Sequence, residues 1–191
     1  KYAKEILSLY SSATKDIGEL TGLVKGSISI GASTTIGNYL LPTIISSLRR
    51  NHPKIKFHLF VGNTKRIVEL LNSGNIDFGL VEGDLTTQKL KVEQLIRDEL
   101  VVIVSAMHPL AKKKDISIFD VIKEPFILRE EGSGTRQIIE KYLNMHGIST
   151  HDVKSPLMLG STEAIKEAVE SGIGISIISE WAARKECKHN T

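Results

Sequence analysis

The sequence predicts an α/β protein built from two lobes of alternating strands and helices. Three observations carry this prediction. Residues 27–81 read β-α-β-α-β, which is typical of a parallel sheet covered by helices. Residues 90–178 repeat the alternation in a second unit. Small polar residues recur at the turns from strand to helix, which indicates that the two units are similar.

Residues 1–24 carry the most regular pattern of the chain. Apolar residues recur there at alternating spacings of three and four, which makes a heptad seam. The seam consists of Ala3, Ile6, Tyr10, Ala13, Ile17, Leu20 and Val24. A helix packed on its own domain would show the same stripe. Because Gly22 and Gly26 separate this segment from the first predicted strand, we expect a helix that pairs with a partner helix.

The first unit starts with a strand in which Ile28 and Ile30 alternate with small residues. Residues 36–40 come next at helical spacing, and Pro42 must kink that helix or open a new one. The remaining expected elements are a strand over 55–61, a helix over 67–71 that Gly74 ends, and a buried strand over 76–81.

The second unit starts with two strand candidates, 90–96 and 100–105, separated by Asp98 and Glu99. The further expected elements are a short helix over 116–122, a buried strand over 126–129, an amphipathic helix over 138–145 ended by Gly147, a strand over 153–159 broken by Pro156, a helix over 161–171 and a buried strand over 173–178. We expect the basic runs Lys112–Lys114 and Arg184–Lys188 to be solvated edges.

Composition argues against several functional classes. A net charge of +3 is too small to indicate nucleic-acid binding by this chain. One cysteine, Cys187, cannot form an internal disulfide framework and fits a reducing compartment. Because no apolar run approaches the roughly 18 residues of a membrane span, we expect a cytoplasmic protein with no membrane contact.

Four polar turns stand where ligands bind in doubly wound sheets, at the carboxyl ends of strands. They are Ser33, Thr34 and Thr35; Asn63 and Thr64; Glu131, Ser133, Gly134, Thr135 and Arg136; and Ser161 and Thr162. Helix N-capping would account for any one of them. Together they favour a cleft between the lobes for a small polar ligand, because Gly132 and Gly134 let backbone N–H groups point at an anion.

Catalysis is not indicated. The six histidines show no metal-ligand spacing, and no GxSxG motif activates a serine. Gly172 and Gly174 precede a strand, so they do not fit a dinucleotide-binding motif. Glu82, Glu130 and Glu131 could act as acid or base, but carboxylates at strand ends are usually solvated. We expect binding without an enzymatic activity, a metal or a cofactor.

A family resemblance rests on these same turns. The chain looks like the effector-binding domain of LysR-type transcriptional regulators, and within them like the CysL-like branch that is associated with sulfur-assimilation genes. The resemblance covers about residues 24–185 and is carried by GASTTIGNYLLP, LNSGNIDFGLVEG, MHPLA, ILREEGSGTR and LGSTEAIKEAVESGIGISIIS.

The resemblance implies two Rossmann-like lobes of the type II periplasmic-binding-protein fold, preceded by a linker helix. By analogy, residues 1–23 are the linker and dimerisation helix. Residues 24–97 with 160–191 form lobe I, and residues 98–159 form lobe II.

The resemblance also implies a small anionic effector in the cleft between the lobes, such as a sulfur oxyanion or an acetylserine-type inducer. The corresponding positions are Ser33, Thr35, Glu82 with the adjoining Gly83, and Ser133–Thr135. Glu82 departs from the hydroxyl expected at a sulfate-like site. Its carboxylate would repel an anion, so it either forms a salt bridge with Arg136 or Arg129, or the effector carries a donor.

Two parts of the family pattern have no counterpart in these residues. Without an N-terminal winged helix-turn-helix, we expect DNA binding only through such a part of a full-length protein, as a homodimer or homotetramer. The last strand and helix of lobe I are expected beyond Thr191. A transporter solute-binding protein and a two-lobe enzyme, such as a deaminase or transferase, are the alternatives.

Overall fold

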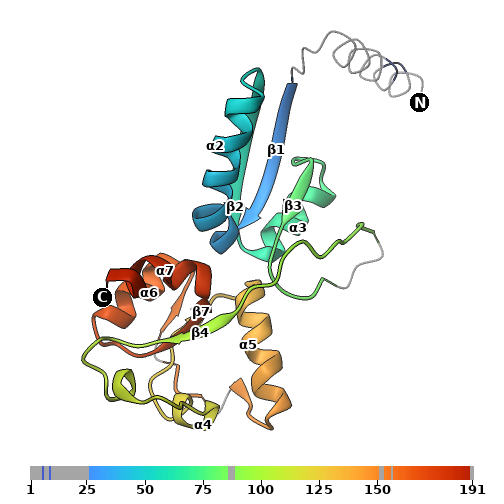
Figure 1. The fold of residues 1–191 in the computed structure, drawn as a ribbon. Coiled ribbons are helices and arrows are strands. Elements are labelled where there is room, and N and C mark those ends of the chain that lie inside the picture. Colours follow the sequence, from blue (N-terminus) through green and yellow to red (C-terminus); the bar gives the residue numbers. More distant parts are fainter. Residues whose placement is uncertain are drawn as a thin grey trace.

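The computed structural model describes residues 6, 9, 26–85, 89–150, 153–155 and 157–189. Two lobes are visible, one formed by residues 26–83 and the other by residues 100–189 (Figure 1). The predicted heptad seam of residues 1–24 lies outside the described residues, apart from Ile6 and Leu9, which are both exposed.

The first lobe is a parallel three-stranded sheet with helices. Strand β1 (Gly26–Ser33) lies between β2 (Ile55–Gly62) and β3 (Phe78–Leu80). Helices α2 (Leu41–Asn51) and α3 (Thr64–Asn72) connect the strands. The β-α-β-α-β order predicted for residues 27–81 is therefore confirmed. Ile30 and Ala32 of β1 form the buried core with Leu41 of α2.

A π-helical turn, η1 (Ile36–Leu40), leads from β1 into α2. The N–H of Leu41 donates to the carbonyl of Ile36, five residues back. Pro42 stands in the first turn of α2, where no intrahelical N–H bond is needed, so it opens a new helix. A Cβ at Gly37 would stand 2.8 Å from Val61 Cγ2, so this turn packs tightly on β2.

The second lobe consists of short strands and helices. Strand β4 (Leu100–Ile103) pairs antiparallel with β7 (Ser176–Ser179), and β5 (Leu128–Arg129) pairs parallel with β6 (Met158–Leu159). The helical segments are η2 (Pro109–Lys112), α4 (Ile118–Val121), α5 (Gly134–Met145), α6 (Thr162–Glu170) and α7 (Glu180–His189).

The apolar run 126–128 is buried on both of its faces. Phe126 and Leu128 pack in one cluster with Leu143 of α5. Ile127 points the other way and packs with Ile165 of α6. This alternation explains why a strand covered on both sides reads as continuously apolar.

The described residues of 160–191 pack with a different lobe from the one that the resemblance implies. Helix α6 contacts β5, β6 and β7, and Ile165 and Ile178 are buried against Ile127. The described residues of 160–191 therefore pack with 98–159, whereas the resemblance groups them with 24–97. The apolar side chains of α6 and β7 bury Ile127 in one cluster, and this packing places both elements in the second lobe.

Two strand predictions in the second unit were wrong in whole or in part. Residues 90–96 form no strand, and Val92, Leu95 and Ile96 each expose more than half of their surface. Of the strand expected over 153–159, the structure forms only the two residues of β6 among the described residues.

The two basic runs are exposed where the structure describes their side chains, as predicted. Lys112–Lys114 lies at the surface, and Lys113 pairs there with Asp120 at 2.7 Å. Arg184 and Lys185 lie on the exposed side of α7, whose other side buries Ala182 and Ala183. The second run therefore belongs to an amphipathic helix that packs on the second lobe.

Among the described residues, no helix has the length and apolar character that a bilayer-crossing segment requires. In the same part of the chain, no three metal-ligating side chains gather at one place.

Candidate functional site

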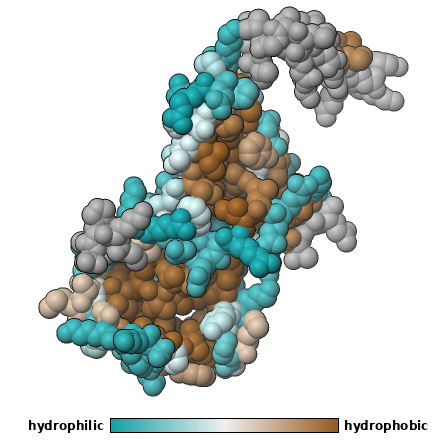
Figure 2. Space-filling view, viewed as in Figure 1, coloured by the Kyte–Doolittle hydropathy of each residue, from teal (hydrophilic) through white to brown (hydrophobic). Residues whose placement is uncertain are grey.

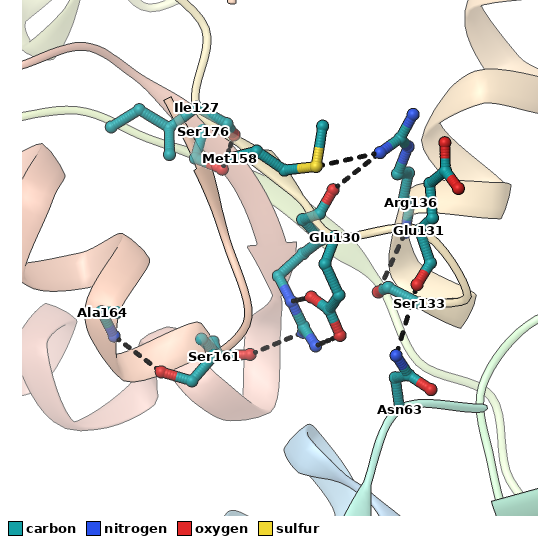
Figure 3. A network of polar contacts seen from close by, with 12 residues as sticks. Asn63, Ile127, Glu130, Glu131, Ser133, Arg136, Met158, Ser161, Ala164 and Ser176 are labelled. Carbon is teal, nitrogen blue, oxygen red and sulfur yellow. Dashed lines mark hydrogen bonds and ion pairs between the residues drawn. The ribbon is translucent and has the colours of Figure 1, made fainter. Parts of the chain in front are cut away.

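The two lobes meet where the N-termini of α3 and α5 approach each other. Asn63 caps α3, because its Oδ1 accepts from the N–H of Arg66 at 2.9 Å. Its Nδ2 donates across to the carbonyl of Glu131 at 3.3 Å (Figure 3). The N–H of Lys65 donates to the carbonyl of Gly132 at 3.1 Å. These bonds hold the turn that precedes α5 against the first lobe.

Two glycines let the backbones of the lobes touch. A Cβ at Gly134 would stand 2.6 Å from Thr64 Oγ1, and Thr64 Oγ1 itself donates to the carbonyl of Glu82 at 3.1 Å. Gly83 has a φ of 92°, and a side chain there would stand 3.1 Å from the Cα of Gly134. Gly83 and Gly134 are thus needed for the close approach.

Buried polar atoms without partners gather at the same junction. Ser33 at the end of β1 and Thr135 in the first turn of α5 each expose only 3% of their surface. Within the described part of the chain, Ser33 Oγ, Thr135 Oγ1 and Glu82 Oε1 form no hydrogen bond. Since a buried polar atom normally has a partner, these three atoms are candidates for binding a ligand.

Thr35 is buried at the N-cap position of the π-helical turn, yet its side chain makes no capping hydrogen bond. The simple explanation of this turn as an N-cap therefore does not hold for Thr35. Its side chain lines a cavity together with Glu82 and Gly83.

That cavity has a volume of about 1370 Å³. Its walls are mostly apolar and come from β3, from residues 84–85 and 90–99 and from α5, where Ile138 and Tyr142 line it. On the surface, Figure 2 shows apolar residues gathered on each lobe and hydrophilic residues between the two lobes. The polar group Thr35, Glu82 and Gly83 therefore stands beside a large apolar volume.

Burial raises the pKa of the Glu82 carboxyl above its ordinary value of 4.5. The hydroxyls of Ser33 and Thr35 act in the opposite direction, the charge of Asp98 adds to the increase, and the charge of Arg129 opposes it. Glu82 thus takes up a proton more readily than an exposed glutamate.

Of the two alternatives for Glu82, the salt bridge with Arg129 or Arg136 does not form. Arg129 is buried and donates to both carboxylate oxygens of Glu130, at 2.8 and 3.0 Å, and to Thr162 Oγ1 at 3.1 Å. Arg136 Nε donates to Glu140 at 2.6 Å, and its Nη1 donates to the carbonyl of Arg129 at 3.2 Å. Both guanidinium groups are used within the second lobe.

Several sequence candidates have structural roles instead. Ser133 Oγ accepts from the N–H of Arg136 at 3.4 Å, and Ser161 Oγ accepts from the N–H of Ala164 at 3.1 Å (Figure 3). Both serines cap helices, as the N-capping alternative predicts. Glu131 is exposed, and Thr34 is half-buried at the end of β1. The structure therefore brings together Ser33, Thr35, Glu82, Gly83, Gly134 and Thr135, and it separates Ser161, Thr162 and Arg136 from them.

A second contact between the lobes was not predicted. Lys166 of α6 stands 4.9 Å from the ring centroid of Tyr39 in η1, and its Nζ donates to Glu186 at 2.6 Å. Beside it, Asn38 donates to Glu163 at 3.3 Å. No local pattern signals these pairs, because their members lie far apart in the sequence.

Comparison with known proteins gives a consistent result. The family described as LysR substrate binding domain matches residues 21–191. The chain is 35% identical over 187 residues to the HTH-type transcriptional regulator CysL of Bacillus subtilis, covering 98% of this chain and 62% of that protein. It is 36% identical over 191 residues to the probable RuBisCO transcriptional regulator of Cyanidium caldarium, covering 98% and 60%.

Among solved structures, the CcmR regulatory domain of Synechocystis PCC6803 in complex with 2-PG superimposes with a TM-score of 0.75 at 31% identity. That match covers 83% of this chain and 74% of the other. The chain spans about three fifths of the length of the two sequence relatives.

Proposed function

Because the chain belongs to the LysR family, as its substrate-binding domain, we propose that it senses a small anionic metabolite in the cleft between its lobes. The fold is the type II periplasmic-binding-protein fold, and the relatives are transcriptional regulators, not enzymes. In this proposal the domain also takes part in oligomerisation and passes the binding event on to DNA-binding parts of a longer protein.

The pair of buried hydroxyls on Ser33 and Thr135 is the observation that carries the proposal. Neither has a partner within the described residues, and they belong to different lobes. Gly134 and Thr135 also lie in the first turn of α5, where N–H groups have no intrahelical acceptor. Such donors suit the oxygens of an anion.

Two of the relatives indicate the chemical class of the proposed anion. The likeness to CysL supports a compound of sulfur assimilation, either a sulfur oxyanion such as sulfite or an acetylserine-type molecule. The likeness to a CcmR domain that binds 2-PG supports a small acid more generally. We therefore propose a small acid as the effector class, with sulfur-assimilation compounds among the candidates.

The wider assembly is proposed by analogy. Residues 1–23 would be a linker helix that joins protomers into a homodimer or homotetramer. DNA would be bound only through a winged helix-turn-helix of the longer protein, in the cytoplasm. The assignment of residues 24–97 to lobe I and 98–159 to lobe II belongs to the same analogy.

Ligand-dependent thermal unfolding tests the proposal. A ligand at a hundredfold excess over its dissociation constant stabilises the fold by about 2.7 kcal/mol. Each kcal/mol raises the melting temperature by roughly 2–4 °C for a chain of this size. We would screen sulfite, sulfate, thiosulfate, phosphate and acetylserine.

The change Thr135→Val keeps the side-chain shape and removes the hydroxyl, so it should reduce the ligand-induced shift. Thr43→Val on the exposed side of α2 is the matched control and should leave it intact. The proposal fails if no anion in the panel stabilises the protein. It also fails if Thr135→Val retains the full shift, because the ligand then binds elsewhere.

A further inference from the structure

We propose that the cleft selects a small carboxylic acid that also carries a hydrogen-bond donor, either an ammonium or a hydroxyl group, and that Glu82 receives this donor. The inference rests on the proposed function and narrows its ligand class. It separates organic acids with a donor from bare inorganic oxyanions such as sulfite.

The Glu82 side chain offers a buried acceptor atom to a ligand. Its Oε1 is buried and has no hydrogen-bond partner within the described residues, and the residue lines the large cavity together with Thr35. Leaving a buried acceptor unpaired is costly, so a ligand that supplies a donor at this point gains affinity. The hydroxyls of Ser33 and Thr35 lie beside the same carboxyl.

The charges around the Glu82 carboxyl favour a hydrogen-bond donor over a second anion. Arg129, a cation whose charge acts on Glu82, already binds Glu130 and Thr162. The further charge that acts on Glu82 is Asp98, which is also negative. A bare oxyanion beside Glu82 would therefore meet the negative charges of Glu82 and Asp98, and the charge of Arg129 is shared with Glu130. An ammonium or hydroxyl group would be attracted instead.

The first turn of α5 would bind the opposite end of the ligand. Helix α5 is 12 residues long and starts at Gly134, against the carbonyl of Glu82. Its first turn presents the buried, unpaired hydroxyl of Thr135 beside N–H groups at the positive end of the helix dipole. A carboxylate fits this end, while the donor on the same molecule reaches Glu82. A small molecule with both a carboxylate and such a donor is an amino acid or a hydroxy acid.

A matched series of probes tests the donor requirement. L-alanine, L-lactate and propionate share one carbon skeleton and differ in carrying an ammonium, a hydroxyl or no donor. Calorimetric titration of the whole chain with these probes and with sulfite should rank alanine and lactate at least roughly tenfold tighter than propionate and sulfite. Glu82→Gln should reduce the preference for alanine over propionate by roughly tenfold. The control Glu170→Gln makes the same change at an exposed position of α6 and should leave the ranking unchanged.

The outcomes separate this inference from the proposed function. If sulfite or propionate binds as tightly as alanine and lactate, and does so through Thr135, the function stands and the donor requirement is wrong. A ranking that is unchanged in Glu82→Gln also overturns the role of Glu82. If none of the probes binds at millimolar concentration, the donor-bearing acid is excluded. The proposed function itself fails only when no anion of the wider panel binds through Thr135.

Discussion

Gly134 of the second lobe lies directly against Glu82 of the first. A Cβ at Gly134 would stand 2.6 Å from the carbonyl carbon of Glu82 and 2.6 Å from Thr64 Oγ1. The same carbonyl accepts the hydrogen bond of Thr64. No side chain fits at this position unless the lobes move apart.

The change Gly134→Ala should therefore destabilise the protein. Alanine favours a helix by up to about 1 kcal/mol over glycine, but overpacking costs typically about 1–3 kcal/mol. We expect a net decrease in the free energy of unfolding, measured by urea denaturation. Gly160→Ala is the control, because a Cβ at Gly160 meets nothing within 4 Å. Equal stability of the two variants would contradict the close contact.

The pH dependence of Glu82→Gln should follow from the raised pKa. Above pH 4.5 the unfolded chain releases the Glu82 proton while the folded protein still holds it, so the free energy of unfolding falls as pH rises through this window. Glutamine removes this dependence. The variant should match the unmodified protein below pH 4.5 and become progressively more stable above it, in unfolding measured over a pH series. A stability difference that is constant over pH would show that burial does not shift this pKa.

The contact of Lys166 with Tyr39 and Glu186 predicts opposite effects for two neighbouring changes. Lys166→Met removes the charged partner of Glu186 and should lower the free energy of unfolding by about 1–3 kcal/mol. Tyr39→Phe keeps the ring under Lys166 and removes a buried hydroxyl that forms no hydrogen bond within the described residues. It should leave the melting temperature unchanged or raise it. A large destabilisation by Tyr39→Phe would mean that the hydroxyl has a partner.

Asp120 should contribute to stability only above its own titration range. Hydrogen bonding to Lys113, and to the backbone and side chain of Ser117, lowers the pKa of Asp120 from 3.8 to about 2. The stability from this group is full above pH 3.8 and is lost as pH falls toward about 2. Asp120→Asn should therefore destabilise the protein at neutral pH and lose its effect near pH 2. A carboxyl titration followed by NMR would show an ordinary midpoint if the capping box of α4 did not form.

The sequence predicts the first lobe well because its signals are local. Ile28 and Ile30 alternate, Asn63 caps the next helix, and Gly74 ends it with a positive φ of 71°. Each of these patterns depends on residues a few positions apart. The second lobe is predicted less well, because its strands shorten to two or four residues and its core depends on Ile127 meeting Ile165.

The candidate site is predicted only in part, because a hydroxyl used as a helix cap and a free hydroxyl look alike in the sequence. The polar turns at Ser33–Thr35 and Ser133–Thr135 both lie beside Glu82, but their sequence does not tell which hydroxyls are used as caps. Ser133 caps α5, whereas Thr135 remains without a partner among the described residues. The side chain of Arg136 turns away because Glu140, four residues on, binds it. That spacing is visible in the sequence and could have revealed the pair.

The π-helical turn before α2 has a consequence for the evolution of the proposed binding site. A π turn equals an α-helical turn with one inserted residue. Each residue of an α-helix turns the chain by about 100°, so the insertion fixes how Thr35 and Tyr39 are rotated relative to α2. Deletion of a single codon within 36–40 would restore a continuous α-helix and swing Thr35 out of the cavity and Tyr39 away from Lys166 in one step. Ligand recognition and the contact between the lobes would then be gained or lost together, through a change of chain length and not of side-chain chemistry.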